Sequence, residues 1–357
     1  MAFRFEECGS AADGELAEGC KLCTKGAKMV LFVTGVCGTG CFYCPVSFEK
    51  KEMSGTYANE LKISSDEDII SEAESMNALG TGITGGDPLC DIDLTLHYIK
   101  MLKSRFGKKH HIHLYTSTMD PEKVRKLAEA GLDEIRFHPG DNTWDSFDTE
   151  TFGKIKSIPG LDAGIEVPAL PRKEESLGKL ISSAFEAGAD FVNLNELEFS
   201  ESNWDMMERR GYSVKDGTSS AVYGSEETAL ALLKKYPGKR IHYCSSSFKD
   251  GIQLRRRLIR KAEGTAKEYD VVTEEGTLLK GILYADDLHK AADFLEKEYG
   301  VPPELIFVDE ERNRMETAAW VLEELADSLP YRCYITEEYP TADRLEVERM
   351  PLGPRSR

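Results

Sequence analysis

Three cysteines of the sequence have a spacing that suits an iron–sulfur cluster. They form the pattern Cys37-x3-Cys41-x2-Cys44, and small residues separate the first two cysteines. Cysteine thiolates favour iron–sulfur clusters, and three of them can each hold one iron of a cubane while the fourth iron stays open for another ligand. The alternative is a zinc site that a distant fourth ligand completes.

A second short motif, Gly85-Gly86-Asp87-Pro88, follows a short apolar run at 81–84. Two glycines let backbone groups come close to a ligand, and Pro88 fixes the turn that follows. Alone, these four residues indicate only a turn. Their place one strand–helix unit after the three cysteines makes them a candidate binding loop.

The elements that position these motifs alternate in type from residue 29 onward. Apolar runs predict strands, and amphipathic segments between them predict helices. Strands alternating with helices at this spacing indicate a parallel sheet, and this many units favour a barrel or partial barrel with its function at the strand carboxyl ends. The expected strands are 29–34, 81–84, 111–117, 133–140, 162–171, 190–199 and 240–246. Helices are expected at 64–80, 91–107, 121–131, 144–157, 176–188, 226–236 and 249–262.

Three further cysteines could form a second metal site. Cys20 and Cys23 stand just before the first expected strand, and Cys244 ends the last. The first and last strands of a nearly closed barrel lie near each other, so the three cysteines could meet at an auxiliary iron–sulfur cluster, favoured here, or at a zinc ion. The fourth ligand would be Cys8, His242 or Cys333. The alternative is that Cys244 is a small buried apolar residue and that Cys20 and Cys23 belong to an unrelated turn.

The cluster loop and its surroundings resemble the radical S-adenosylmethionine (SAM) superfamily. The resemblance lies in the cysteine spacing, in Tyr43 before the last cysteine and in the second motif, which is similar to the family's Gly-Gly-Glu-Pro. It implies a [4Fe–4S] cluster on Cys37, Cys41 and Cys44. It also implies that residues Gly85, Gly86, Asp87 and Pro88 hold the methionyl amino group of SAM. Asp87 departs from the family's Glu, so a side-chain contact there would be shorter.

The resemblance also implies further SAM contacts at the ends of the middle strands. Polar residues stand at those places: Thr116, Ser117, Arg136, His138 and Glu166. Each has a structural alternative. His138, before Pro139, could cap a strand, and Glu166 could pair with Arg136.

Three parts of the chain are expected: a cysteine-containing segment at 1–28, a radical SAM partial (β/α)6 barrel of TIM type at 29–262, and a small α+β domain at 263–357. The last has expected strands at 269–274, 277–284, 305–308, 331–337 and 344–350 and helices at 286–299 and 312–328, an order that allows a ferredoxin-like fold. The insertion at 200–225 is expected to be a lid.

The composition and net charge limit which binding partners and which cellular location we expect. The net charge of −18 disfavours broad nucleic-acid or anionic-membrane binding. Neither a membrane span nor a signal peptide is apparent, so we expect a cytoplasmic protein. The nine cysteines are then unlikely partners for disulfides, and Cys90 and Cys333 are expected to be core residues.

Within the radical SAM resemblance, residues 29–262 are most similar to an uncharacterised, mainly archaeal group related to pyruvate formate-lyase activating enzyme. The implied activity is reductive cleavage of SAM to a 5′-deoxyadenosyl radical, with electrons from a ferredoxin or flavodoxin, and hydrogen abstraction from an unknown substrate.

Several substrate classes stay open at this stage. The enzyme could modify a protein or a tRNA, with basic residues at 253–261 on phosphates. It could close the 200–225 insertion over a small metabolite, with Trp204 and Tyr212 lining the pocket. It could activate a glycyl-radical enzyme, although activases of that type are smaller. A zinc-stabilised binding module is the non-enzymatic alternative.

Overall fold

The chain forms two compact units. The structure, a computed structural model, describes residues 3–217 and 219–353. One unit comprises Met1–Ala73 with Ala78–Leu254, and the other comprises Glu74–Asn77 with Arg255–Arg357. The sequence analysis placed residues 249–262 with the barrel, whereas the division falls between Leu254 and Arg255. Within the described residues, no helix is long and apolar enough to cross a membrane.

The first unit is built on a curved, mainly parallel sheet. Its strand order is β1-β2-β11-β10-β9-β8-β7-β6-β3-β4-β5. The strands from β3 to β11 along this order pair in parallel, and short antiparallel strands border them on both sides. The parallel strands are β3 (Lys28–Phe32), β6 (Gly80–Thr84), β7 (His111–Thr116), β8 (Glu134–Phe137), β9 (Asp162–Pro168), β10 (Phe191–Asn195) and β11 (Ile241–Cys244). The edge strands are β1 (Arg4–Phe5), β2 (Ala11–Asp13), β4 (Tyr57–Ala58) and β5 (Leu61–Lys62).

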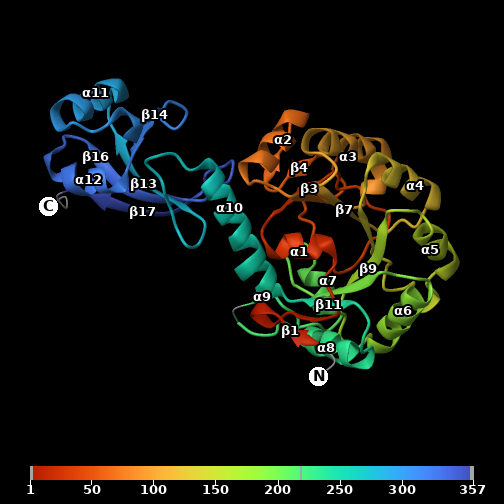
Figure 1. Cartoon of the computed structure of the whole chain (residues 1–357). Coiled ribbons are helices and arrows are strands. Elements are labelled where there is room, and N and C mark those ends of the chain that lie inside the picture. Colours follow the sequence, from red (N-terminus) through yellow and green to blue (C-terminus); the bar gives the residue numbers. More distant parts are fainter. Residues whose placement is uncertain (1–2, 218, 354–357) are drawn as a thin grey trace. The chain divides into compact units, whose positions relative to one another are not determined.

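Helices surround the outer side of this sheet, as Figure 1 shows. They alternate with the strands along the chain, as in the expected partial barrel: α2 (Asp66–Ser75), α3 (Ile92–Phe106), α4 (Pro121–Ala130), α5 (Thr149–Lys156), α6 (Glu174–Glu186) and α8 (Ser225–Lys235). Local signals explain their ends. The Asp120 carboxylate accepts hydrogen bonds from the first turn of α4, Pro121 begins that helix, and Gly131 ends it in a left-handed conformation.

The N-terminal segment is part of this unit. Strand β2 pairs antiparallel with β11, and α1 (Glu18–Thr24) contacts β3, β6 and β7 from inside the curved sheet (Figure 1). The backbone amide of Gly19 donates to Glu134 Oε2 at 3.1 Å. A Cβ atom at Gly19 would lie 2.4 Å from His113 Nδ1, so only glycine allows α1 to approach the sheet this closely.

The second unit has the predicted ferredoxin-like organisation. Its elements run β13 (Leu278–Tyr284), α11 (Leu288–Tyr299), β14 (Ile306–Asp309), β15 (Arg314–Thr317), α12 (Ala319–Leu325) and β16 (Arg332–Glu338). The antiparallel sheet order β14-β15-β13-β16 is that of a split β-α-β fold, and β17 (Glu346–Leu352) extends it beyond β16. Short β12 (Val271–Val272) pairs with β13, and α10 (Arg255–Thr265) precedes it.

Two expected helices differ in the structure. The segment expected as one helix over 312–328 begins with strand β15, which pairs with both β13 and β14, before α12 starts. The helix expected over 249–262 begins as a π-helix, η4 (Lys249–Leu254), and continues as α10. In the first case, pairing with two strands overrides the local helix propensity, and in the second the poor helix formers Asp250 and Gly251 fall within the π-helical turns.

The second unit also contains a buried charge network. Lys280 and Glu316 form a buried ion pair at 3.4 Å, and Arg314 and Glu338 lie in the same network. Burial alone would raise the pKa of Glu316, but the charges of Lys280 and neighbouring arginines outweigh it and lower the pKa to about 2.

Candidate functional site

The three spaced cysteines lie on a loop that is closed at its base. The amide of Gly35 donates to the Met53 carbonyl at 2.8 Å, and the amide of Glu52 donates to the Gly35 carbonyl at 3.0 Å. Between these pairs, Cys37 is exposed while Cys41 and Cys44 are partly exposed. We call residues 35–53 the cysteine loop. Its closed base fixes where the chain leaves and re-enters the body of the first unit.

The cysteine loop combines thiols that are at least partly exposed with open space. Burial raises the pKa of the Cys41 thiol, although its hydrogen bond with Tyr43 acts in the opposite direction. Above Gly38 there is open space, since a Cβ atom there would meet nothing within 4 Å. Across residues 3–217 and 219–353, no three His, Cys, Asp or Glu side chains are already arranged as a metal-binding group. The donor set and the open space nonetheless suit an iron–sulfur cluster.

The Gly85–Pro88 motif supports the base of the cysteine loop. The amide of Gly86 donates to the Thr34 carbonyl at 2.6 Å, and the amide of Asp87 donates to the Val36 carbonyl at 2.8 Å. A Cβ atom on Gly86 would lie 2.4 Å from the Val36 carbonyl oxygen. Glycine is therefore required here because two backbones touch.

The Asp87 carboxylate is buried and turned toward the end of β7. It accepts hydrogen bonds from the hydroxyls of Thr116 at 2.7 Å, Ser117 at 2.7 Å and Thr118 at 2.8 Å. The Thr39 hydroxyl in turn donates to Ser117 at 2.7 Å. The expected side-chain contact from Asp87 to SAM is therefore not what this geometry favours, because the carboxylate is engaged in ordering the loop after β7.

Tyr43 and His138 connect the cysteine loop to the middle of the sheet. The Tyr43 hydroxyl and His138 Nε2 are 3.1 Å apart, and His138 Nδ1 lies 2.9 Å from the Glu166 carbonyl oxygen. If Nδ1 donates to that carbonyl, Nε2 is the acceptor for the tyrosine hydroxyl. Burial lowers the pKa of His138, which keeps its imidazole neutral, and burial raises the pKa of Tyr43.

Part of the 200–225 insertion packs on the cysteine loop. Asn203 Nδ2 donates to the Tyr43 carbonyl at 3.1 Å, and Tyr212 stacks on Phe42 with ring centres 5.8 Å apart. Trp204, in α7 (Trp204–Arg209), is about half exposed and packs on Phe199. Neither Trp204 nor Tyr212 lines the cavity described next, so their expected role at a substrate pocket stays a prediction.

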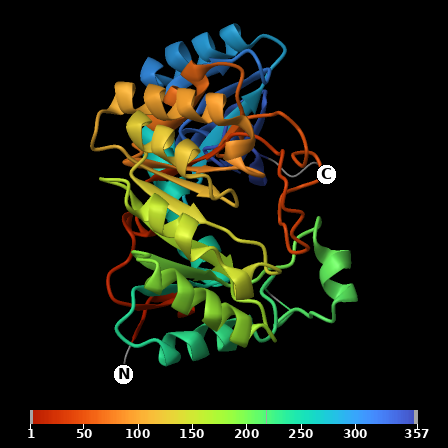
Figure 2. The same ribbon diagram turned by 90° about the vertical axis from the view of Figure 1, so that its right-hand side faces the viewer.

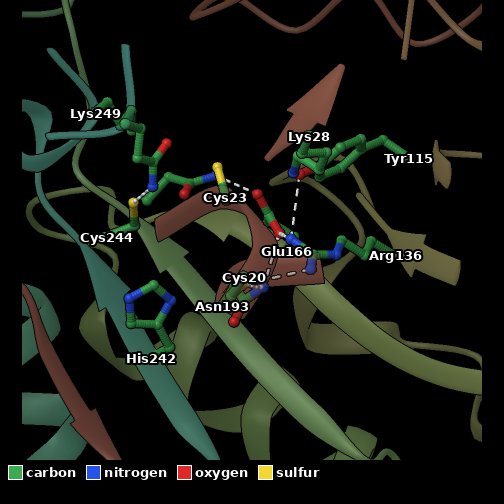
Figure 3. A pocket seen from close by; sticks show the side chains of 12 residues that line it. Cys20, Cys23, Lys28, Tyr115, Arg136, Glu166, Asn193, His242, Cys244 and Lys249 are labelled. Atoms are coloured by element: carbon green, nitrogen blue, oxygen red, sulfur yellow. Dashed lines mark hydrogen bonds and ion pairs between the residues drawn. The ribbon is translucent and has the colours of Figure 1, made fainter. Parts of the chain in front are cut away.

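A cavity of about 260 Å³ lies between α1 and the strands β7 to β11 (Figure 3). Polar and sulfur-bearing side chains line it: Cys20, Cys23, Lys28, Tyr115, Arg136, Glu166, Asn193, Asn195, His242, Cys244, Lys249 and Gln253. The cysteines that were predicted to meet, Cys20, Cys23 and Cys244, all lie on its wall. Lys28, Asn193, Asn195 and Lys249 were missed, although the Asn-Leu-Asn sequence at the end of β10 was a signal for the asparagines.

Arg136 and Glu166 pair across this cavity, as the structural alternative foresaw. Arg136 Nη1 donates to Glu166 Oε2 at 2.6 Å, and Glu166 also accepts from Asn193 at 2.8 Å and Asn195 at 2.9 Å. Burial would raise the pKa of Glu166, but the Arg136 charge and the two amide hydrogen bonds lower it to about 2. Both side chains are therefore charged and mutually satisfied.

The three remaining cysteines, Cys333, Cys90 and Cys8, each lie in a different environment. Cys333 is buried in the hydrophobic core of the second unit, as predicted, which removes it as a ligand candidate for the first. Cys90 was expected in a core but is exposed, because it lies on a short 3-10 turn after Pro88. Cys8 is exposed and does not line the cavity, although its sulfur lies near Gly251 of η4.

Comparison with known proteins shows which family this chain belongs to. Residues 31–139 match the model of the radical SAM superfamily. A protein of Methanocaldococcus jannaschii is 42% identical over 357 residues, covering 95% of this chain and 93% of its own length. The chain belongs to the radical SAM superfamily. As a radical SAM enzyme, it uses a [4Fe–4S] cluster and SAM.

The other similarities add less. The M. jannaschii protein carries the provisional name glycyl-radical enzyme activating enzyme MJ0021. Residues 276–352 of this radical SAM enzyme match a domain of unknown function, DUF8061. Two solved structures are each 14% identical to this chain. HydG, a maturase of the [FeFe]-hydrogenase, has a TM-score of 0.40, and the match covers 68% of this chain and 65% of HydG. Methylornithine synthase (PylB) has a TM-score of 0.41, and the match covers 64% of this chain and 72% of PylB.

Proposed function

We propose that Cys37, Cys41 and Cys44 hold the [4Fe–4S] cluster of this radical SAM enzyme. Three thiol donors on one closed loop, with open space beside Gly38, support this assignment. Bound together with SAM, the cluster supplies a 5′-deoxyadenosyl radical that takes a hydrogen atom from a substrate. A low-potential ferredoxin or flavodoxin is the electron donor that this chemistry requires.

The residues around the loop have assignable roles in this proposal. The partly exposed backbone of Gly85 and Gly86 is the part of this motif that could contact SAM, next to the loop after β7 that carries Thr116 and Ser117. Asp87 is a positioning residue, since it fixes both hydroxyls. Tyr43 and His138 hold the loop against the sheet and present a neutral imidazole. Arg136 and Glu166 pair with each other in the cavity beside α1, so their charges are already balanced and we assign them no direct contact with SAM.

We further propose that the substrate is a polypeptide, and the observation that carries this is an apolar rim around the cysteine loop. Exposed apolar side chains gather on that loop and on the insertion that packs on it: Val36, Phe48, Met53, Trp204, Met206, Val214 and Tyr223. Figure 2 shows the loop and α7 on the same side of the first unit. Exposed apolar groups beside a polar site are typical of a surface that a protein partner covers.

Two other observations agree with a polypeptide. The net charge of −18 disfavours RNA as the partner. The relative's provisional name points to glycyl-radical activation, in which the substrate is a backbone position of another protein. We therefore favour hydrogen abstraction from a protein, with a glycyl-radical enzyme as the first candidate, over the tRNA and small-metabolite alternatives.

A fractionated extract tests both proposals. The reconstituted enzyme is incubated anaerobically with SAM and a strong reductant, and 5′-deoxyadenosine is measured. Fractions of a host-cell extract, separated into macromolecules and small molecules, are then added. Cys41→Ala should abolish product, and Cys8→Ala, far from the loop in sequence and outside the cavity wall, is the matched control.

The outcomes separate the substrate classes. A polypeptide substrate predicts stimulation by the macromolecular fraction that protease removes and RNase does not. In a Phe48→Ser/Trp204→Ser variant, the ratio of stimulated to basal rate should fall severalfold. Stimulation by small molecules, or its loss after RNase treatment, contradicts the polypeptide proposal. A fully active Cys41→Ala variant contradicts the cluster assignment.

A further inference from the structure

A second set of cysteines shares one enclosed space inside the first unit. Cys20 and Cys23 come from α1, and Cys244 is the last residue of β11 (Figure 3). All three therefore face a single cavity, separate from the cysteine loop.

Nitrogen donors point at two of these sulfurs. Arg136 Nη2 and Asn193 Nδ2 each lie 3.4 Å from Cys20 Sγ, and Gln253 Nε2 lies 3.6 Å from Cys244 Sγ. Hydrogen bonds from an arginine and two amides favour the thiolate form of these cysteines, against the cost of burial. Arg136 and Asn193 also donate to Glu166, so their positions serve the carboxylate as well as the sulfur.

Two buried side-chain atoms at the cavity, His242 Nδ1 and Asn193 Oδ1, have no hydrogen-bond partner among the described residues. His242 lines the cavity and is more than nine-tenths buried, and its Nδ1 has no hydrogen-bond partner. A buried nitrogen left unpaired costs free energy, so such an atom needs an explanation. An imidazole nitrogen in such a position can bind a metal.

The size of the cavity favours an iron–sulfur cluster over a single zinc ion. A structural zinc site is closed, because its four ligands converge on one ion. A cavity of about 260 Å³ is far larger than a single water or ion needs, roughly 10–15 Å³ on the same measure. Space for several atoms fits a polynuclear cluster.

We propose that Cys20, Cys23 and Cys244 hold a second iron–sulfur cluster inside the first unit, with His242 as the side chain available to a fourth iron. Lys28 and Arg136 on the same wall offset the negative charge of a cluster bound by thiolates. This site uses none of the cysteines of the cysteine loop. The proposal of a second cluster can therefore be tested separately from the proposed SAM chemistry.

The test counts metal in the full-length protein prepared anaerobically. Iron, sulfide and zinc are measured per chain, and electron paramagnetic resonance spectra are recorded on the reduced protein with and without SAM. Two triple variants are compared with the natural protein: Cys37→Ala/Cys41→Ala/Cys44→Ala, and Cys20→Ala/Cys23→Ala/Cys244→Ala. Cys8→Ala and Cys90→Ala are controls for cysteines outside both sets.

We expect about eight irons in the natural protein and about four in each triple variant. The cysteine-loop variant should keep a reduced-cluster signal that SAM does not alter. The cavity variant should keep the signal that SAM does alter, which also shows that the protein has folded. His242→Ala, a milder change, should alter the SAM-independent signal alone.

Other outcomes overturn the proposal. Zinc bound to Cys20, Cys23 and Cys244, with iron limited to about four per chain, would assign a structural zinc site instead. Iron lost entirely on changing the cysteine loop would mean that the cavity holds no cluster. In that case the SAM-responsive signal of the cavity variant would still uphold the proposed SAM site.

Discussion

Replacing Gly86 by alanine tests whether the Gly85–Pro88 motif supports the cysteine loop. The added Cβ atom would lie 2.4 Å from the Val36 carbonyl oxygen and 2.5 Å from that of Gly35, and contacts under 3.0 Å are essentially never found. Both neighbours are backbone atoms at the base of the cysteine loop, so neither can rotate away. The backbone itself has to move before the methyl group fits.

The magnitude follows from this geometry. Forcing one extra carbon into a filled space costs about 1–3 kcal/mol of unfolding free energy. Catalytic groups displaced by about 1 Å lose on the order of 10²-fold in rate. The backbone shift that the new methyl group requires is somewhat smaller than about 1 Å. The rate of SAM cleavage by Gly86→Ala should therefore fall about tenfold or more. The iron content of the cysteine loop should also fall.

Gly153→Ala is a matched control. Gly153 lies within α5, and a Cβ atom there would meet nothing within 4 Å. The same substitution should therefore raise stability by about 0.5–1 kcal/mol, as expected for alanine in a helix, and leave SAM cleavage alone. Denaturant unfolding and 5′-deoxyadenosine release measure both variants. The reasoning is refuted if Gly86→Ala matches the natural protein in stability, iron content and rate.

Three further predictions concern buried carboxylates. Asp87→Asn keeps the size but removes the charge that three hydroxyls share, so stability should fall by about 2–4 kcal/mol and SAM cleavage should fall with it, as unfolding and product assays will show. Glu166 has a folded-state pKa of about 2, below its usual 4.5, so its stabilising contribution is present above pH 4.5 and disappears as the pH falls toward 2. Acid titration should show a loss of about 3 kcal/mol over that window that Glu166→Gln lacks; equal slopes would contradict this. Glu316→Gln should weaken the buried pair with Lys280 and destabilise the second unit by about 3–5 kcal/mol in calorimetry, whereas an unchanged transition would show that the network contributes little.

Local sequence patterns predicted those strands and helix ends that depend on residues close together in the chain. The apolar run before the cysteines became β3, and the α4 segment showed its helix boundaries through Asp120, Pro121 and Gly131. In the second unit the expected elements were present, but β15 was not expected, so the sequence allowed a ferredoxin-like fold without specifying its strand order. The cysteine-loop motif could be found because its chemistry depends on spacing within a few residues.

Other features depend on partners that the sequence does not reveal. β15 begins Arg-Met-Glu, residues compatible with a helix, and its pairing with β13 and β14 decides the outcome. The Asp87 side chain was expected at the ligand, but the hydroxyls that it orders lie about thirty residues later, after β7. Cys90 was misplaced because a turn after Pro88, rather than a regular element, brings it to the surface.

The location of α1 inside the curved sheet has a consequence for how this protein folds. The edge that holds the N-terminal segment is built late in the sequence: the amide of Ser245 donates to Ser10 Oγ at 3.0 Å across a separation of 235 residues. Contacts of such long range form slowly, because closing the intervening loop loses much chain entropy. During synthesis, the segment that carries Cys20 leaves the ribosome before β11, so the pairing of β2 with β11 that completes this edge of the sheet can form only after most of the first unit has been made.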